Sequence, residues 1–338
     1  MMREIGSEFW DIPLTQTDNA LFPKSTQWFL SGRSALQAIL KELNHCHTVA
    51  MPSWCCDSMV KPFIDAGLKV RFYPVTFNAN LVQCVNLECD VLFLMDYFGY
   101  IGAQPDLKGY NGVIIRDVTH SLFSNDYSDA DYYFGSLRKW GGFWTGGYAW
   151  TKDGHQFKTL KKENFTKDHG YIALREKAMQ SKCEYINARG GADKSYLAIF
   201  NEAEDVLETI DIVPAADRDV NAALKLNVAF IKMRRRKNAE IMRGAFPDWL
   251  VFPELKDSDC PMFVPVLVPD GKRNELRRFL IKNEIYCPVH WPVSEYHKLD
   301  ERTEKIYTDE LSLVCDQRYT EEDMNRMVSI IKAFFKEG

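Results

Sequence analysis

Short apolar runs alternate with stretches of helical spacing through the first half of the chain. Two of the runs, Val91–Met95 and Val113–Ile115, are continuously hydrophobic and lead into an aspartate. Other stretches follow the spacing of one helix face, as in Ala35, Leu36, Ile39, Leu40 and Leu43. Fully apolar strands that alternate with helices are typical of a parallel sheet buried on both faces. The pattern therefore predicts an α/β fold with a mainly parallel central sheet flanked by helices.

Four polar or aromatic side chains fall at the carboxyl ends of the predicted strands. They are Trp54, Asp96, Asp117 and Ser136. Ligands of open α/β sheets bind outside the carboxyl ends of the strands. We therefore expect a ligand site at this edge of the sheet.

The second half of the chain predicts a smaller domain. Its pattern indicates helices over 224–245, 271–283 and 320–335 and a strand over 264–268. We predict a large α/β domain over residues 1–205 and a small α+β domain over 206–338, with 203–210 as the link. Residues 151–205 predict helices broken at Gly190-Gly191. Residues 1–30 are aromatic-rich, and we expect either an arm over the domain or a partner subunit, or strands at the sheet edge.

Composition narrows the class of protein. The 338 residues carry a formal charge of −5, which gives no general attraction to nucleic acid or to anionic membranes. The N-terminus lacks the apolar core of a signal peptide, and no apolar run approaches the ~20 residues of a membrane span. Nine cysteines, an odd number, favour a reducing compartment. We therefore expect a cytoplasmic protein.

One cysteine cluster raises the question of a metal. His45-Cys46-His47 and Cys55-Cys56 offer ligands that zinc accepts. Their spacing matches no finger pattern, and free cysteine commonly packs as a small buried hydrophobe. We therefore predict no metal site.

Residues 132–147 carry the most informative chemistry. Ser136 and Lys139 follow a short aromatic run, and two glycine pairs come after them. A lysine just past a strand end, beside a hydroxyl and flexible backbone, can offer its amine to a carbonyl cofactor. We hypothesise that Lys139 carries pyridoxal phosphate (PLP) as a Schiff base and that Asp117 holds the pyridinium nitrogen. Read alone, Lys139 would be a surface lysine and Asp117 a turn residue.

The first predicted helix offers a second feature of such a site. Ser31 is its expected N-cap, and Gly32, Arg33 and Ser34 form its first turn. Free N–H groups and positive charge at a helix start favour a phosphate. Many helices begin with serine and glycine, so this feature alone also fits an ordinary helix start.

Taken together, these segments resemble the DegT/StrS family of PLP-dependent aminotransferases, within the fold-type-I (aspartate aminotransferase) superfamily. The resemblance spans most of the chain in the family's order. It is carried by Ser31-Gly32-Arg33-Ser34-Ala35-Leu36, Met51-Pro52-Ser53-Trp54, Asp96-Tyr97-Phe98-Gly99, Ile115-Arg116-Asp117-Val118-Thr119-His120-Ser121 and Ser136-Leu137-Arg138-Lys139. In the C-terminal part, His290-Trp291-Pro292 and Leu311-Ser312-Leu313 look like the family's small domain.

The resemblance implies a role for each matching residue. Lys139 would be the Schiff-base lysine and Asp117 the pyridinium partner, with His120 near the cofactor's 3′-oxygen. Ser136 and the turn of Gly32, Arg33 and Ser34 would bind the phosphate. Either Trp54 or Cys56 would face the cofactor ring. The family also implies a homodimer with a shared active site.

Two departures from the family pattern bear on the substrate. Arg116 stands where the family often has an acid, and the family's Asn-x-Arg segment has no clear counterpart. The sequence has Asn187-Ala188-Arg189-Gly190-Gly191-Ala192-Asp193-Lys194-Ser195-Tyr196-Leu197 in that place. The acceptor in much of the family is a nucleotide-linked keto-sugar, and the second departure leaves that acceptor open.

The chemistry that follows is amino transfer. A lysine amine must be neutral to attack an aldehyde, so we expect Lys139 to be buried beside the cationic Arg138. The freed amine would then move the proton of the amino donor, for which glutamate is our expectation, before a keto-sugar or related carbonyl compound accepts the nitrogen. The alternatives are a PLP enzyme of elimination, decarboxylation or racemisation, and a PLP scaffold without catalysis that serves as a regulator.

Overall fold

The computed structural model describes residues 4–15, 18–76, 81–82, 88–101, 107–124, 130–158, 168–188, 193–297, 299 and 301–337. The chain divides into two compact units that interleave along the sequence. Unit 1 comprises residues 8–44 and 131–227, and unit 2 comprises residues 4–7, 45–130 and 228–338. The predicted domains are consecutive instead, so their boundary at 205–206 stays a prediction.

Parallel strands form the first part of unit 2. They are β3 (Thr48–Pro52), β4 (Lys69–Tyr73), β7 (Val91–Met95) and β8 (Val113–Asp117). β3 pairs in parallel with both β4 and β7, and β7 pairs in parallel with β8. All five residues of β7 are buried, as a strand covered on both faces requires. The predicted parallel sheet is confirmed.

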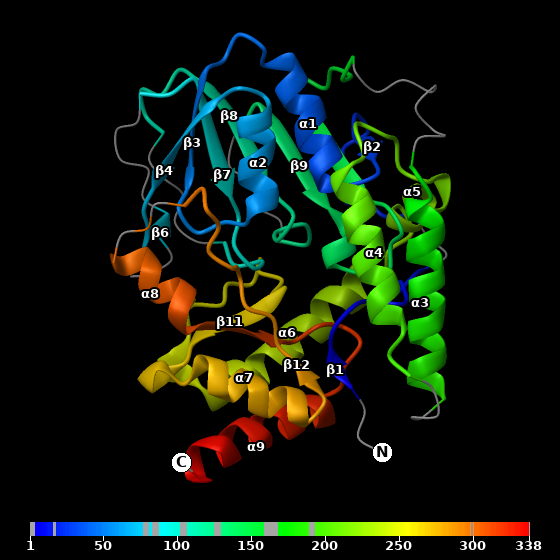
Figure 1. Cartoon of the computed structure of the whole chain (residues 1–338), viewed down its shortest axis with the longest axis vertical. Helices are drawn as coiled ribbons and strands as arrows, with labels where there is room; N and C mark the ends of the chain where they lie inside the picture. The colour runs from blue at the N-terminus through cyan, green and yellow to red at the C-terminus, as the bar shows by residue number, and fades with distance from the viewer. Residues whose placement is uncertain are drawn as a thin grey trace. The chain divides into compact units, whose positions relative to one another are not determined.

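Antiparallel strands and helices make up unit 1. The strands β2 (Gln27–Phe29), β10 (Gly147–Thr151) and β9 (Tyr132–Ser136) pair in that order. The helices are α1 (Gly32–Glu42), α3 (Tyr171–Asn187), α4 (Tyr196–Glu208) and α5 (Asp217–Ala223). α3 and α4 run side by side (Figure 1). Within the described chain, the strand order is β2-β10-β9 in unit 1 and β8-β7-β3-β4 in unit 2.

The rest of unit 2 is a small α+β assembly. Two strands, β11 (Phe263–Leu267) and β13 (Glu310–Val314), pair antiparallel. They share an apolar core with residues of α6 (Val228–Ala245), α7 (Arg273–Lys282) and α9 (Glu321–Glu337). α7 and α9 lie next to each other (Figure 1). The remaining elements of unit 2 are α2 (Asp57–Asp65), α8 (Glu301–Asp309), β1 (Ile5–Gly6), β12 (Ile285–Tyr286), β5 (Val75–Thr76) and β6 (Leu81–Val82).

Three sequence predictions need comment. The helix predicted over 224–245 begins at Val228, because the separate α5 ends at Ala223. The link predicted over 203–210 is mostly the last turns of α4, whose Ala203 and Leu207 are buried. The edge-strand alternative for residues 1–30 is confirmed for β2, the outermost strand of the sheet order. The predicted break at Gly190-Gly191 lies outside the described residues, as does Arg189.

Within the described part of the chain, no helix is long and apolar enough to cross a bilayer.

Candidate functional site

Asp117 occupies the strand-end position that the sequence predicts. It is the last residue of β8 and pairs with Met95 of β7. Its side chain is buried, and Oδ1 accepts a hydrogen bond of 2.8 Å from the Thr119 N–H. This bond fixes the carboxylate at the carboxyl edge of the sheet, where a ligand is expected.

His120 has a defined hydrogen-bonding state. The backbone N–H of Phe98 donates to its Nδ1 at 3.2 Å. An acceptor at Nδ1 means that the neutral ring carries its hydrogen on Nε2. The buried ring lies 4.9 Å from the ring of Phe98 and stacks on Trp291 at 5.9 Å and 21°. His120 therefore presents a fixed N–H donor from unit 2.

Trp54 belongs to the aromatic core of unit 2. It is fully buried and stacks on Tyr97 with 5.0 Å between ring centroids and 14° between planes. Its Nε1–H donates to the His290 carbonyl at 2.6 Å. Cys56, by contrast, is only partly buried and caps α2 through its backbone, with Sγ 2.8 Å from the Ser58 hydroxyl. The more accessible Cys56 is the better candidate to face a ligand.

The predicted phosphate-binding residues lie together in unit 1. Ser31 caps α1, because its Oγ accepts the Ser34 N–H at 3.1 Å. The amides of Gly32 and Arg33 precede the first N–H that an intrahelical carbonyl can satisfy. A Cβ on Gly32 would lie 3.3 Å from the Cβ of Ser136, so the end of β9 meets the helix start. Two free amides beside a partly exposed hydroxyl suit an anion.

Ser34 differs from the other predicted residues. Its side chain is buried, and its Oγ lies 3.1 Å from the Ser31 Oγ and 3.4 Å from the Asp211 carbonyl. The hydroxyl therefore takes part in the internal hydrogen bonding of unit 1. The backbone of this turn is the stronger candidate for contact with a phosphate.

The second glycine pair after Lys139 has a structural reason that the sequence did not reveal. A Cβ on Gly147 would lie 1.9 Å from the Ser31 carbonyl oxygen. Gly146 adopts a φ of +126°, which side chains other than glycine rarely adopt. Strand β10 can therefore pass directly against the start of α1.

Lys139 is exposed, which corrects the expectation of a buried amine. It ends the short 3-10 helix η1 (Leu137–Lys139) that follows β9. The preceding Arg138 turns inward, where its guanidinium forms an ion pair with Glu204 of α4. Glu204 also lies 3.6 Å from the buried guanidinium of Arg175. Arg138 is partly buried while Lys139 is exposed, so the ion pair of Arg138 does not bury the neighbouring amine.

Arg116 is balanced by a carboxylate that the sequence prediction did not connect with it. Its fully buried guanidinium donates to Asp96 Oδ1 at 2.6 Å, and Ser121 donates to Asp96 Oδ2 at 2.6 Å. Asp96 follows β7 and Arg116 lies in β8, so neighbouring parallel strands bring them together. An arginine inside an apolar strand, with an aspartate directly after the preceding apolar strand, is the signal that could have found this pair.

The candidate residues fall into two groups. Gly32, Arg33, Ser34, Ser136 and Lys139 belong to unit 1, and Trp54, Cys56, Asp117 and His120 belong to unit 2. The pairing of Lys139 with Asp117 around one cofactor stays a prediction. Among the residues that the structure describes, no group of three or more His, Cys, Asp or Glu side chains could hold a metal ion.

Comparisons with known proteins point to one fold. No family model matches the sequence, and no curated protein matches it. Solved structures do match. The aminotransferase PseC of Helicobacter pylori, involved in the biosynthesis of pseudoaminic acid, is similar with a TM-score of 0.63 and 14% identity, over 98% of this chain and 100% of that chain.

Two further structures agree with it. A DegT DnrJ EryC1 StrS aminotransferase from Brucella abortus has a TM-score of 0.61 and 15% identity, over 91% of this chain and 85% of its own. Spr1654 of Streptococcus pneumoniae, provisionally assigned as a sugar aminotransferase and solved in a PLP form, has a TM-score of 0.60 and 14% identity, over 92% and 87%. At such identities the likeness shows the fold, and this chain has the fold of these aminotransferases.

Proposed function

We propose that this chain is a PLP-dependent aminotransferase. It would move an amino group from an amino acid, glutamate in the first instance, to a keto-sugar or related carbonyl compound. The observations that carry the proposal are Lys139 on the turn after β9 and the approach of Ser136, at the end of that strand, to the start of α1, where a phosphate would bind. The fold that the chain shares with aminotransferases, one of them solved in a PLP form, supports it.

The residues fit the cofactor at its charged ends. The amides of Gly32 and Arg33 and the Ser136 hydroxyl would hold the phosphate, since a helix start favours an anion. Asp117 would hold the ring nitrogen, and its carboxylate is already fixed by the Thr119 amide. His120 would donate from Nε2 to a ring oxygen. When bound, PLP supplies an electron sink for charge that develops on the donor's α-carbon.

The protein's own part in the reaction would be proton transfer and orientation. Lys139 Nζ would take the proton from the α-carbon of the amino donor and return it to the acceptor's carbon in the reverse half-reaction. Asp117, as an anion, would keep a proton on the ring nitrogen.

The exposure of Lys139 bears on assembly. An amine in water would release its carbonyl partner to hydrolysis, because closed sites are what protect such linkages. We therefore propose that a second copy of the chain covers Lys139, as the family resemblance implies. Light scattering of the purified protein should give a dimer mass, and a monomer at micromolar concentration would contradict this part of the proposal.

Borohydride reduction followed by peptide mass spectrometry tests the cofactor assignment. The reduced protein should carry one pyridoxyl group on Lys139, and its visible absorbance band should disappear in Lys139→Ala. Lys152→Ala is the matched control, since Lys152 is an exposed lysine that also follows a strand, β10. An adduct on another lysine, or no adduct after incubation with PLP, would overturn the proposal.

Nitrogen transfer separates amino transfer from other PLP chemistry. Glutamate labelled with ¹⁵N should leave its label on a keto-sugar acceptor, with 2-oxoglutarate formed in equal amount. Loss of the donor's carboxylate or inversion of its α-carbon without label transfer would identify a decarboxylase or racemase instead.

A further inference from the structure

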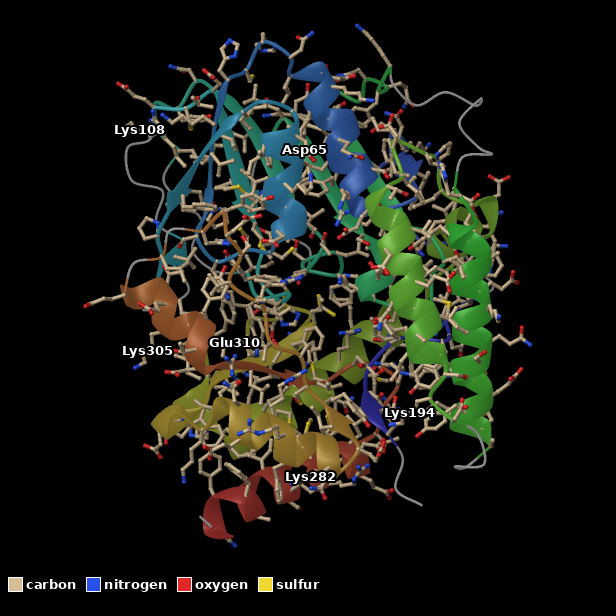
Figure 2. The ribbon with its side chains drawn as sticks, viewed as in Figure 1. Asp65, Lys108, Lys194, Lys282, Lys305 and Glu310 are labelled. Carbon is tan, nitrogen blue, oxygen red and sulfur yellow. The ribbon has the colours of Figure 1, made fainter. Side chains whose placement is uncertain are left out.

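A hydrogen-bonded chain of three side chains lies in the interior of the small α+β part of unit 2. Glu310, labelled in Figure 2, is the first residue of β13 and is fully buried. Its Oε1 accepts from the Ser312 hydroxyl at 2.5 Å, and the same hydroxyl lies 2.8 Å from Nδ1 of His290. Its Oε2 accepts the backbone N–H of His290 at 2.8 Å.

The hydrogen bond from the His290 backbone N–H fixes the direction of the hydrogen bonds among Glu310, Ser312 and His290. An amide N–H can only donate, so Oε2 of Glu310 is always an acceptor. A proton bound by Glu310 must therefore sit on Oε1, facing Ser312. The hydroxyl of Ser312 has one hydrogen, so it donates either to Glu310 or to His290 but not to both.

Two arrangements follow. When Glu310 is ionised, Ser312 donates to it and Nδ1–H of His290 donates to Ser312. When Glu310 is protonated, it donates to Ser312, and Ser312 donates to an unprotonated Nδ1, which leaves the hydrogen of the neutral imidazole on Nε2. Conversion needs one proton, which enters at Nε2, while one hydrogen passes from Nδ1 to Ser312 and one from Ser312 to Oε1. The imidazole begins and ends neutral.

His290, at one end of the three hydrogen-bonded side chains, lies among candidate site residues of unit 2. Its ring lies 5.1 Å from the ring of Phe98 and 6.3 Å from that of His120. The next residue, Trp291, stacks on His120. The carbonyl of His290 accepts the indole N–H of Trp54. A change in which ring nitrogen of His290 carries the hydrogen therefore occurs beside the aromatic rings that pack against His120.

We propose that Glu310, Ser312 and His290 form a proton relay, in which Glu310 stores a proton and Ser312 sets the tautomer of His290 beside the candidate site. As an account of catalysis it rests on the proposed aminotransferase function, in which Glu310 and Ser312 act as positioning residues through His290. The relay itself depends only on the hydrogen-bond geometry.

The burial of Glu310 favours its protonated form. Burial raises the pKa of Glu310 to about 8, against the opposing effects of the bonds from Ser312 and His290 and of the positive charge of Arg273. Arg273 on α7 donates to the Glu310 carbonyl, and Asp309 of α8 is the neighbouring acid in the chain. The raised pKa favours the arrangement in which Glu310 keeps its proton, and a rise in pH favours the other.

Imidazole ¹⁵N NMR of the full-length protein, labelled on histidine, tests the relay with no cofactor bound. The His290 signals, assigned by their loss in His290→Asn, should change from the Nε2–H tautomer to the Nδ1–H tautomer as the pH rises through the titration of Glu310, within the range in which the imidazole is neutral. In Glu310→Gln the backbone N–H of His290 takes the amide oxygen, so the NH₂ group faces Ser312 and the Nε2–H tautomer should persist throughout that range. In Ser312→Ala the tautomer should no longer follow the titration of Glu310.

His297 is the matched control within the same spectra. Its Nδ1 lies 2.8 Å from the Ser294 hydroxyl, and among the described residues this serine–histidine pair has no recorded bond to a buried carboxyl group. The signals of His297 should be the same in the native chain, in Glu310→Gln and in Ser312→Ala. The proposal is overturned if the His290 tautomer does not change with pH in the native chain, or if it changes equally in Ser312→Ala. Should Glu310→Gln fail to fold, the native chain and Ser312→Ala decide the result.

Catalysis supplies an independent readout. The rate of amino transfer should lose one ionisation from its pH profile in Ser312→Ala while the visible absorbance of bound PLP is retained. A protein that binds no PLP refutes the proposed function and leaves the NMR result standing. An unchanged pH profile in a loaded enzyme refutes the relay's part in catalysis and leaves the aminotransferase assignment standing.

Discussion

The buried pair of Asp96 and Arg116 makes the sharpest prediction about stability. The guanidinium is fully buried, the carboxylate is 7% exposed, and the two lie 2.6 Å apart. Removing one member of such a pair costs about 3–5 kcal/mol, because the remaining charge stays in a medium that solvates it poorly. We expect Asp96→Asn to lower the free energy of unfolding by this amount. The Ser121 hydroxyl bond to the same carboxylate adds to the loss.

A second substitution separates the charge from the packing. In Asp96→Asn/Arg116→Met the unbalanced charge is gone, and a buried ion pair is often replaced by apolar groups with little loss. The double variant should therefore recover most of the stability that Asp96→Asn loses. If the double variant is as unstable as the single one, charge balance is not the reason for the pair.

An exposed pair in the same unit gives the matched control. Lys61 and Asp65 on α2 lie 2.7 Å apart but are each more than half exposed, and Asp65 is labelled in Figure 2. Water and salt screen such pairs, so Asp65→Asn should cost no more than about 0.5 kcal/mol. Urea titration followed by tryptophan fluorescence, with amide hydrogen exchange of β7 and β8, measures both variants. A loss below about 1 kcal/mol for Asp96→Asn would refute the reasoning.

Three further predictions follow from burial, close approach and capping. Glu310 binds its proton more tightly in the folded protein than in the unfolded one, so this group stabilises the fold in full below about pH 4.5. Its contribution declines by up to about 1.4 kcal/mol per pH unit until about pH 8. Thermal unfolding measured between these pH values should show the decline, and Glu310→Gln should abolish the decline. Gly147→Ala places a methyl group against the Ser31 carbonyl and should destabilise unit 1 by about 1–3 kcal/mol in urea titration, whereas an unchanged midpoint would contradict the close approach. Ser31→Ala removes a cap and should cost about 1 kcal/mol in the same assay, while Ser195→Ala, at a helix start without a side-chain cap bond, should cost only a few tenths.

The strand-end residues show which features of the fold the local sequence pattern can predict. Asp117 ends a segment in which the apolar residues Val113–Ile115 are followed by Arg116, and its place at the end of a parallel strand could be predicted from period and composition alone. Ser31 could be predicted in the same way as the cap of α1. These features depend on neighbours in the sequence.

The environments of the side chains could not be predicted from the sequence in that way. The prediction for Lys139 was wrong about burial, because the exposure of a side chain on a turn depends on which distant groups pack there. The preceding Arg138 pairs with Glu204, on a helix 66 residues later in the chain. Trp54 is a core residue because Tyr97 and the His290 carbonyl meet it from other segments. No local period contains such partners.

The sequence by itself determined the types of the main helices and strands, the parallel part of the sheet, and which residues stand at the strand ends, since each of these follows from the spacing of apolar residues and from short-range turn chemistry. Only the tertiary structure decided which charges are balanced, which nitrogen of His120 carries its hydrogen, and that Glu310, Ser312 and His290 form one hydrogen-bonded chain. Those properties depend on atoms brought within 3.2 Å of one another from distant parts of the chain, where burial makes each missing partner costly.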